Sequence, residues 1–408
     1  MTHESRPPVE LLAPAGSPEK LEIAIHYGAD AVYLAGKAFS LRNFSGNFSM
    51  AELKHGIADA HQKGVKVYVA TNVFSRNHEQ SAIAAYLAAV GRMEPDAFII
   101  SDPGVLRIAQ QHAPHIPIHL STQANTTNLN SALFWRDSGV KRINTARELS
   151  LEEIRGISDA CDIEIEAFVH GAMCMSYSGR CLLSAFMTHR DSNRGMCAHP
   201  CRWRYAVVEE TRPGKYFPVF EDDRGAYIFN AADLCMIDHL PAMIRAGISS
   251  LKIEGRMKGI NYLAATVKVY REAIDDYTNH SATFGVKDAW RQELSHISHR
   301  SYCTGFYFGD PDQILPNYDN ASPATLQTFL GKVVQNLGHK TLLIDTRNKF
   351  FDGEWVEILP ARGPARKDQI TSIRDETGKA LSFVQPNRQV LVTLGRDYAP
   401  NDLIRRPC

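Results

Sequence analysis

The chain has 408 residues, of which 44% are hydrophobic and 22% are charged. This length predicts two or three domains of about 150 residues each, with at least one large core. The 45 basic residues are balanced by 45 acidic residues, which excludes a general polyanion-binding protein but not a local basic patch. No apolar run approaches the roughly 18 residues that span a bilayer, and the N-terminus lacks a signal-peptide pattern. We therefore expect a soluble, cytoplasmic protein without a membrane segment.

The first 170 residues repeat one pattern, in which a short β-rich apolar run is followed by an amphipathic, helix-like stretch. Eight such strands over roughly 250 residues are typical of a (β/α)8 barrel. An open doubly wound sheet would show the same alternation, but no G-x-G-x-x-G motif follows any strand, so the barrel is favoured. The predicted strands are Val9–Ala13, Ala31–Leu34, Lys66–Thr71, Ala97–Ser101, Ile118–Ser121, Arg142–Thr145, Ile163–Val169 and Ser250–Glu254.

The last two predicted barrel strands are separated by an unusually long segment, residues 170–249, which holds five of the eight cysteines. A connection of this length inside a compact domain is more often functional than not. Beyond Phe329 the pattern changes to short β-like runs separated by turns, which predicts a small all-β barrel. We therefore expect a (β/α)8 domain over residues 1–325 and a β-domain over 326–408. The predicted β-runs are Lys332–Val334, Lys340–Thr346, Trp355–Leu359, Gln369–Ile373 and Gln389–Leu394.

Four cysteines fall within the 28 residues from Cys174 to Cys201. In a large chain without an export signal, clustered cysteines indicate a metal or redox centre rather than disulfides. The series Cys174-x6-Cys181, then Cys197 and Cys235, lacks the C-x2-4-C pairs usual for zinc, apart from Cys197-x3-Cys201. An iron–sulfur cluster, whose four thiolates can come from scattered loops, is the favoured interpretation. Zinc and buried, inert cysteines remain the alternatives.

The cysteine segment is also rich in arginine, and Asp191 is its single acid between residues 171 and 205. Positive charge favours thiolates and offsets the charge of an anionic cluster. The same side chains could bind phosphates or carboxylates of a substrate. The arginines are Arg180, Arg190, Arg194, Arg202 and Arg204.

Polar residues gather at the carboxyl ends of the predicted strands, where barrel enzymes carry their chemistry. Lys252, Glu254 and Arg256 alternate along one strand and therefore share a side, which indicates an anionic ligand if that side is the barrel interior. His170 directly follows the seventh strand and could transfer protons, although a lone histidine or strand-end charge is more often structural. Other polar residues at strand ends include Asn72, Asp102, Gln123, Asn125, Arg147 and Glu148.

Common hydrolase signatures are missing. The sequence contains neither H-E-x-x-H nor G-x-S-x-G, so neither a zincin nor a nucleophile-elbow hydrolase is indicated. The C-x3-C-x2-C spacing of radical enzymes is absent as well. A cysteine protease that uses Cys303 with nearby His299 remains an alternative, although nothing in the sequence favours it.

Several long stretches are similar to one known family. ELLAPAGSPEKLEIAIHYGADAVYLAG, STQANTTN, RELSLEEI, FVHGAMCMSYSGRCLLS, CAHPCRW, NAADLCMIDHLP and SLKIEGRMKG together resemble peptidase family U32, from about Glu10 to Gly309 and more weakly beyond. Despite the family name, several members resemble anaerobic hydroxylation proteins that act on tRNA, rRNA or ubiquinone precursors. The single barrel followed by a small β-domain is most similar to the tRNA hydroxylation branch.

This resemblance implies prephenate-dependent 5-hydroxylation of the wobble uridine of tRNA, with oxygen that does not come from O2. It places the four ligands of a [4Fe–4S] cluster on Cys174, Cys181, Cys197 and Cys235, with Cys201 as an alternative ligand. His170, Lys252, Glu254 and Arg256 would then be catalytic pocket residues, and Gln123, Asn125, Arg147, Arg180 and Arg202 would bind substrate. The alternatives are a peptidase, a hydroxylase of rRNA cytidine or of a ubiquinone precursor, and an RNA-binding subunit that acts with a homologous partner.

Overall fold

The computed structural model describes residues 9–40, 46–173, 181–190, 196–198, 200, 221–222, 225–226, 232–309 and 327–407. Cys174, Arg180, Cys201 and Arg202 lie outside the described residues. Within these ranges, no helix is both long and apolar enough to cross a membrane.

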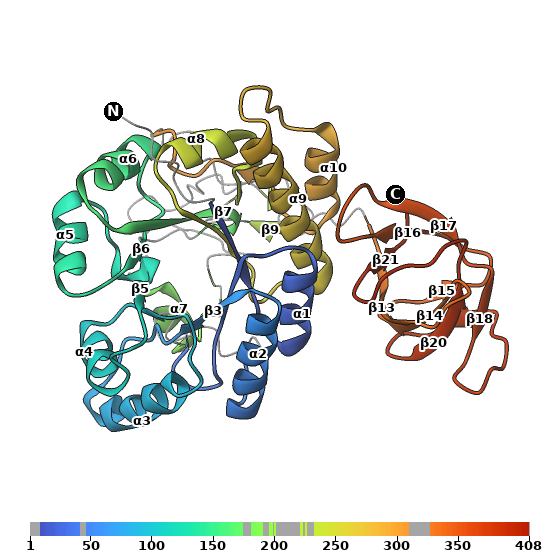
Figure 1. The fold of residues 1–408 in the computed structure, drawn as a ribbon, viewed down its shortest axis with the longest axis horizontal. Coiled ribbons are helices and arrows are strands. Elements are labelled where there is room, and N and C mark those ends of the chain that lie inside the picture. The colour runs from blue at the N-terminus through green and yellow to red at the C-terminus, as the bar shows by residue number, and fades with distance from the viewer. Residues whose placement is uncertain are drawn as a thin grey trace, which may run out of the picture.

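Residues 10–253 form a closed barrel of eight parallel strands (Figure 1). The first seven strands pair in chain order, and the eighth pairs with both the seventh and the first, for example Lys252 with Phe168 and with Leu12. This closure confirms the predicted (β/α)8 barrel and excludes the open doubly wound sheet. The barrel strands are β1 (Glu10–Pro14), β2 (Ala31–Leu34), β3 (Lys66–Ala70), β4 (Ala97–Ile100), β5 (Ile118–Leu120), β6 (Arg142–Asn144), β7 (Glu164–Ala172) and β11 (Ser250–Ile253).

Helices cover the outside of the barrel, and local sequence signals set where several of them begin. Ser49 and Ser150 each form a capping box with the glutamate three residues on, and Asp102 accepts hydrogen bonds from two backbone amides at the start of its helix. The helices are α1 (Pro18–His26), α2 (Met50–Gln62), α3 (Gln80–Gly91), α4 (Pro103–His112), α5 (Leu129–Asp137), α6 (Leu151–Ala160), α7 (Leu183–Thr188), α8 (Leu240–Arg245), α9 (Ile260–Asn279) and α10 (Asp288–His296), with short 3-10 turns η1 (Asn77–Glu79), η2 (Thr122–Ala124) and η5 (Ile237–His239).

The seventh strand is longer than predicted and ends at Ala172 rather than Val169. Its end pairs antiparallel with β10 (Asp233–Cys235), which in turn pairs with β12 (Tyr302–Cys303). These two short strands extend the sheet beyond the closed barrel. A further hairpin, β8 (Glu221–Asp222) and β9 (Gly225–Ala226), lies in the same long connection. Sequence patterning misses such pairing because it comes from a segment far away in the chain.

The C-terminal region is an antiparallel all-β domain, as expected. Its main sheet has the order β17-β16-β21-β13-β14-β20-β18. The predicted run Gln369–Ile373 is wrong as a single strand, because the chain changes partner there: β17 pairs with β16, whereas β18 pairs with β20. The strands are β13 (Phe329–Asn336), β14 (Thr341–Thr346), β15 (Phe350–Phe351), β16 (Trp355–Leu359), β17 (Arg366–Gln369), β18 (Ser372–Arg374), β19 (Phe383–Val384), β20 (Gln389–Thr393) and β21 (Leu403–Arg405).

The β-domain packs against α1, α9 and α10 of the barrel (Figure 1). Leu359 and Leu403 belong to the barrel's own hydrophobic core, and the Tyr27 hydroxyl donates a 2.7 Å hydrogen bond to the Leu359 carbonyl. The buried Arg405 guanidinium pairs with Glu293 of α10 and with Glu357 of β16. These apolar and ionic contacts hold the β-domain in one position beside the barrel.

Candidate functional site

Three residues predicted to line the pocket, Lys252, Glu254 and Arg256, lie around the ring of Tyr33. The Lys252 ammonium lies 4.4 Å from the centre of the Tyr33 ring, and the Arg256 guanidinium carbon lies 5.9 Å from it. The Tyr33 hydroxyl is 3.4 Å from a Glu254 carboxylate oxygen. Lys252 and Arg256 are both buried. The predicted strand Ser250–Glu254 is one residue too long: β11 ends at Ile253, so only Lys252 is placed by strand alternation, and the turn after the strand brings Glu254 and Arg256 to the same ring.

Arg147 joins this group through the ring of Phe168. Its guanidinium carbon lies 4.0 Å from the ring centre and the Lys252 ammonium 5.6 Å from it. Arg147 also donates a 3.0 Å hydrogen bond to the carbonyl of Ala172, at the end of β7. Three cations from two segments of the chain thus share two aromatic rings at the barrel mouth. Cations held on ring faces are partly desolvated and attract anionic groups strongly.

The β5–α5 connection adds polar atoms to the same end of the barrel. The Thr122 hydroxyl donates a 3.0 Å hydrogen bond to the Thr145 carbonyl, and the Ala146 amide donates a 3.2 Å hydrogen bond to the Thr126 carbonyl. These bonds tie the turn that carries Gln123 and Asn125 to the carboxyl end of β6. Asn125 has the left-handed conformation (φ 56°) that asparagine tolerates better than most residues.

Four buried side-chain atoms at this place have no hydrogen-bond partner among the described residues. They are Gln123 Oε1, Asn125 Oδ1, Thr126 Oγ1 and Asn144 Oδ1. Buried polar atoms in proteins are nearly always hydrogen-bonded, so such a group indicates a place where a polar ligand or water is bound. Because Asn144 follows the inward-facing Arg142 by two residues, it also faces the barrel interior.

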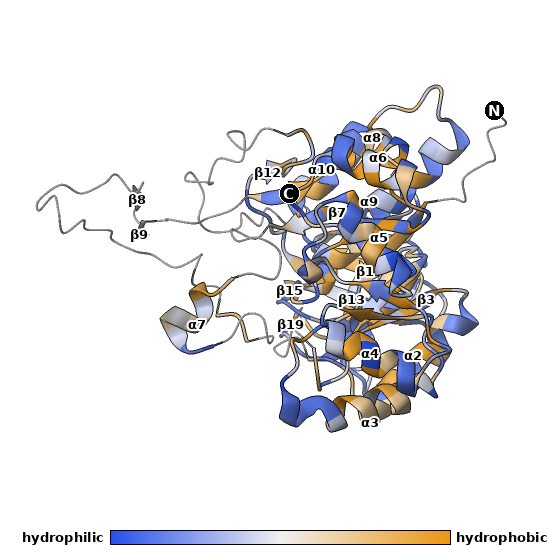
Figure 2. Ribbon diagram, turned by 90° about the vertical axis from the view of Figure 1, so that its left-hand side faces the viewer, coloured by the Kyte–Doolittle hydropathy of each residue, from blue (hydrophilic) through white to orange (hydrophobic). Residues whose placement is uncertain are grey.

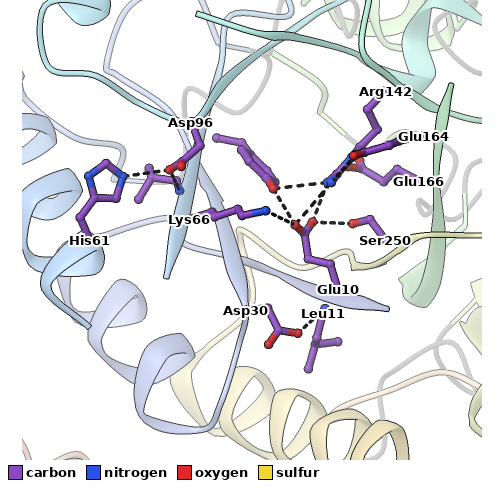
Figure 3. A network of polar contacts seen from close by, with 12 residues as sticks. Glu10, Leu11, Asp30, His61, Lys66, Asp96, Arg142, Glu164, Glu166 and Ser250 are labelled. Carbon is purple, nitrogen blue, oxygen red and sulfur yellow. Dashed lines mark hydrogen bonds and ion pairs between the residues drawn. The ribbon is translucent and has the colours of Figure 1, made fainter. Parts of the chain in front are cut away.

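A second charged layer, which our sequence analysis missed, lies deeper in the barrel (Figure 3). Arg142 pairs with Glu10 at 2.6 Å, and Glu10 accepts hydrogen bonds from the Tyr68 hydroxyl at 2.6 Å and the Ser250 hydroxyl at 2.8 Å. Lys252 pairs with Glu166 at 2.6 Å and links this layer to the mouth. The sequence does contain a sign of this layer, because Glu10 and Arg142 are charged residues at inward-facing positions of otherwise apolar strands.

The electrostatics of Glu10 follow from this pairing. Burial opposes its ionisation, but the positive charge of Arg142 and the hydrogen bonds from Arg142, Tyr68 and Ser250 outweigh burial and lower the pKa of its carboxyl group. Burial also lowers the pKa of His119, and Arg142 and Lys252 lower it further. Glu10 and Arg142 are therefore paired and ionised, whereas Glu166 Oε2 and His119 Nδ1 of the same layer have no hydrogen-bond partner among the described residues.

His170 lies apart from the barrel mouth. Its ring packs against Tyr262 and Tyr270 of the outer helix α9 and against Tyr302 of β12, with ring centres 5.3 to 5.8 Å away. Complete burial lowers the pKa of His170 to about 3. The ring is therefore neutral at physiological pH, and it faces the outer helix rather than Lys252 and Arg256, although the His170 carbonyl accepts a 2.9 Å hydrogen bond from the Glu254 amide.

Three of the predicted cluster cysteines lie within the described residues. Cys181 and Cys197 are half-buried, and their segments are joined by a 2.9 Å hydrogen bond from the Ala198 amide to the Ser184 hydroxyl. Cys235 lies opposite His170 in the β7–β10 ladder, and burial raises the pKa of its thiol to about 11. Within the part of the chain that is described, no three His, Cys, Asp or Glu side chains form a group that could hold a metal ion.

Comparisons with known proteins cover both domains. The profile of peptidase family U32 matches residues 16–317, and that of the peptidase family U32 C-terminal domain matches residues 326–405. The tRNA hydroxylation protein P1 of Bacillus subtilis (strain 168) is 38% identical over 97% of this chain and 94% of its own. The tRNA hydroxylation protein P of Helicobacter pylori (strain J99) is 44% identical over 94% and 90%.

A ribosomal RNA enzyme is similar over a shorter length. The 23S rRNA 5-hydroxycytidine C2501 synthase of Escherichia coli (strain K12) is 34% identical, over 65% of this chain and 39% of its own. The two tRNA hydroxylation proteins named above, in contrast, match more than nine tenths of this chain. Given the matched profiles and these identities, the chain belongs to peptidase family U32.

Proposed function

We propose that this protein hydroxylates tRNA, specifically by prephenate-dependent 5-hydroxylation of the wobble uridine with the help of an iron–sulfur cluster. The observation that carries the proposal is the match, over more than nine tenths of this chain, to relatives named for tRNA hydroxylation. The product replaces the C5–H bond of uracil by C5–OH, a two-electron oxidation. The barrel mouth supplies groups suited to hold both an RNA base and an anionic co-substrate.

The unpartnered polar atoms at the mouth are suited to recognise a base. A uridine in an anticodon must leave its stack before C5 can be reached, and enzymes read such a flipped base through hydrogen bonds to its edge. Gln123, Asn125 and Asn144 each carry an amide with donor and acceptor groups, and the oxygen of each is buried without a partner among the described residues. An unpartnered amide oxygen can accept the N3–H donor of a uracil edge, and the amide NH2 group of such a side chain is the part that could donate to its O2 or O4.

The three cations at the mouth are suited to hold a carboxylate. Prephenate carries two carboxylates, and Arg147, Lys252 and Arg256 converge on the Tyr33 and Phe168 rings from two segments. Glu166 holds the Lys252 ammonium at 2.6 Å, which fixes its position before a ligand arrives. The role assigned here to Lys252 and Arg256 is to bind and orient the co-substrate, with Glu254 next to them through Tyr33.

The cluster ligands remain part of the proposal. Cys181 and Cys197 fit a cluster site best, because they are half-buried, their segments are hydrogen-bonded to each other, and arginine is abundant around them. Cys235 is half-buried at the end of β10, next to the connection that holds the other cysteines. When bound, a [4Fe–4S] cluster would supply redox chemistry. We assign its ligands to Cys174, Cys181, Cys197 and Cys235, with Cys201 as an alternative.

Cys181→Ser tests the cluster. We expect the anaerobically purified variant to lose most of its iron and its visible absorption, and to form no 5-hydroxyuridine. Cys161→Ser is the matched control, because Cys161 is buried in the barrel core outside the cysteine segment and should leave the iron content unchanged. Full iron and full product in Cys181→Ser would remove Cys181 from the ligand set.

A peptidase gains no support from the described site. Both ring nitrogens of His299 contact backbone carbonyls, those of Arg300 at 2.6 Å and Ser295 at 3.2 Å, and burial raises the pKa of the Cys303 thiol. Neither group is therefore prepared to act as base or nucleophile. Proteolysis that survived complete removal of iron would restore this alternative.

The deciding experiment is nucleoside mass spectrometry of tRNA from cells with and without the gene, in a background that also lacks the oxygen-dependent route to the same product. Loss of 5-hydroxyuridine and its derivatives supports the proposal. Unchanged tRNA would overturn it, and parallel analysis of rRNA and quinones would then test the other hydroxylation substrates. Product that appears only when a homologous chain is co-expressed would identify this protein as one subunit of a pair.

A further inference from the structure

The β-domain exposes a pair of aromatic rings that are not part of its hydrophobic core. Phe351 in β15 lies directly opposite Phe383 in β19, and the two side chains are 46% and 41% exposed. Their strand neighbours Phe350 and Val384 point the other way and are 1% and 2% exposed. The buried pair anchors the two strands, and the outer rings stand side by side with centres 6.1 Å apart. An exposed aromatic pair on a monomer is a common mark of a binding surface.

A lysine lies over both of these rings. The Lys349 ammonium is 4.9 Å from the Phe351 ring centre and 4.4 Å from the Phe383 ring centre. No carboxylate pairs with Lys349 among the described residues. The guanidinium of Arg406 donates a 3.0 Å hydrogen bond to the Lys349 carbonyl, and the same guanidinium pairs with Glu354 at 2.7 Å. Two adjacent aromatic faces with an unneutralised cation are the elements with which proteins bind unpaired nucleotides, by stacking on the base and pairing with the phosphate.

The charge of the β-domain is complementary to a polyanion. Residues 327–407 contain 13 Lys and Arg against 9 Asp and Glu, a net charge of +4. Since the whole chain is neutral, the remaining residues carry −4. Much of this charge is neutralised across the domain boundary, because Lys332, Arg347, Arg362 and Arg405 pair with carboxylates of the barrel. The choice of RNA over an apolar protein partner therefore rests on Lys349, whose ammonium lies beside both rings without a carboxylate partner among the described residues.

The position of the pair suits an RNA that also reaches the barrel mouth. Figure 2 shows β15 and β19 toward the side of the molecule on which α7 lies, and α7 belongs to the connection that follows the carboxyl end of β7. Figure 1 shows the β-domain beside α1 and α9, away from the barrel axis. The strands that carry the pair thus lie toward the same side of the molecule as α7, displaced from the barrel axis.

We propose that Phe351, Phe383 and Lys349 form a stacking platform for unpaired bases of the tRNA, distinct from the base that the barrel modifies. This inference rests on the proposed function, because it takes tRNA as the substrate. The platform adds affinity for the whole RNA and takes no part in the reaction. Its loss should therefore raise KM and leave kcat unchanged.

The test uses the full-length, iron-loaded protein and its cognate tRNA transcript. In Phe351→Leu/Phe383→Leu the exposed rings become aliphatic side chains, which keep the apolar bulk but lose the aromatic faces. We expect about tenfold weaker tRNA binding by fluorescence anisotropy, in line with the effect of losing base–aromatic stacks. The thermal unfolding midpoint should not change. Lys349→Gln should weaken binding less, and should lower the slope of log affinity against log salt by about one.

Two matched controls separate the platform from general effects of substitution. Phe134→Leu alters an aromatic side chain on α5 that is 62% exposed, and Lys54→Gln removes an exposed charge on α2. Both should bind tRNA as the wild type does. A folded double variant with wild-type affinity and KM would overturn the platform even if the wild-type protein forms 5-hydroxyuridine. If the wild-type protein neither binds nor modifies tRNA, the proposed function fails and the platform fails with it.

Discussion

The barrel interior contains two polar layers that differ in how completely their groups are paired. In the deeper layer, Glu10 is ionised and held by Arg142, Tyr68 and Ser250. At the mouth, by contrast, four buried polar atoms have no partner within the described chain. The deeper layer is built from strand residues that face the interior, whereas at the mouth only Asn144 is in a strand and the other three residues lie in the β5–α5 connection. Sequence spacing cannot distinguish them, but hydrogen-bond partners can.

We expect the paired charges to contribute to the stability of the fold and the unpartnered atoms to contribute to ligand binding. Buried charges that satisfy one another are costly to disturb, because removing one partner leaves the other charged and desolvated. Unpartnered polar atoms destabilise the free protein and gain their partners when a ligand binds. Substitutions in the deeper layer should therefore change folding, and substitutions at the mouth should change the reaction.

The largest effect is expected from Arg142→Met, which leaves the carboxylates of Glu10 and Glu166 without the cation between them. We expect a loss of about 3–5 kcal/mol in the free energy of unfolding, measured by urea denaturation of the full-length protein. Arg136→Met is the matched control, because its ion pair with Asp137 is exposed and its loss should leave the free energy of unfolding nearly unchanged.

A double variant sharpens this prediction. Glu10→Gln/Arg142→Met removes both charges at once and should recover part of the lost stability, since no isolated charge remains between β1 and β6. Equal unfolding free energies for Arg142→Met and the wild type would show that the deeper layer does not stabilise the barrel.

The opposite result is expected at the mouth. Asn144→Leu replaces a buried amide whose oxygen has no partner among the described residues with an apolar side chain of similar size. Stability should stay within about 1 kcal/mol of the wild type or rise. Formation of 5-hydroxyuridine should fall about 10- to 100-fold, because a hydrogen bond to the base is lost. Retained activity together with lower stability would place Asn144 in the structural layer instead.

Much of the barrel could be predicted from the sequence, because its signals are local. Each parallel strand reads as a short apolar run, and residues such as Ser49 and Ser150 mark where helices begin. Lys252, Glu254 and Arg256 do meet around Tyr33, although the turn after Ile253, and not strand alternation, places the last two. These features depend on residues close together in the chain.

The rest depended on contacts between distant segments. Arg142 meets Glu10 across 132 positions, and Phe351 meets Phe383 across 32. His170 was predicted to line the pocket because it follows a predicted barrel strand. In the structure the end of β7 pairs with β10, and tyrosines of α9 and β12 pack against the His170 ring. These tyrosines are about 90 or more positions away in the chain, so the residues next to His170 could not indicate the contact.

The smallest effect is a pH dependence that comes from the deeper layer. Burial, Arg142 and Lys252 hold the pKa of His119 well below its ordinary value of 6.5, so the folded protein keeps this ring neutral while the unfolded chain binds a proton below pH 6.5. This histidine therefore has no effect on stability well above pH 6.5, and it destabilises the fold progressively as pH falls below that value. His119→Gln removes this titration, so its unfolding free energy should fall less than that of the wild type between pH 7.5 and 5.5. Since Arg142 is one cause of the low pKa, Arg142→Met should also reduce the pH dependence, and identical pH profiles for all three proteins would contradict the assignment.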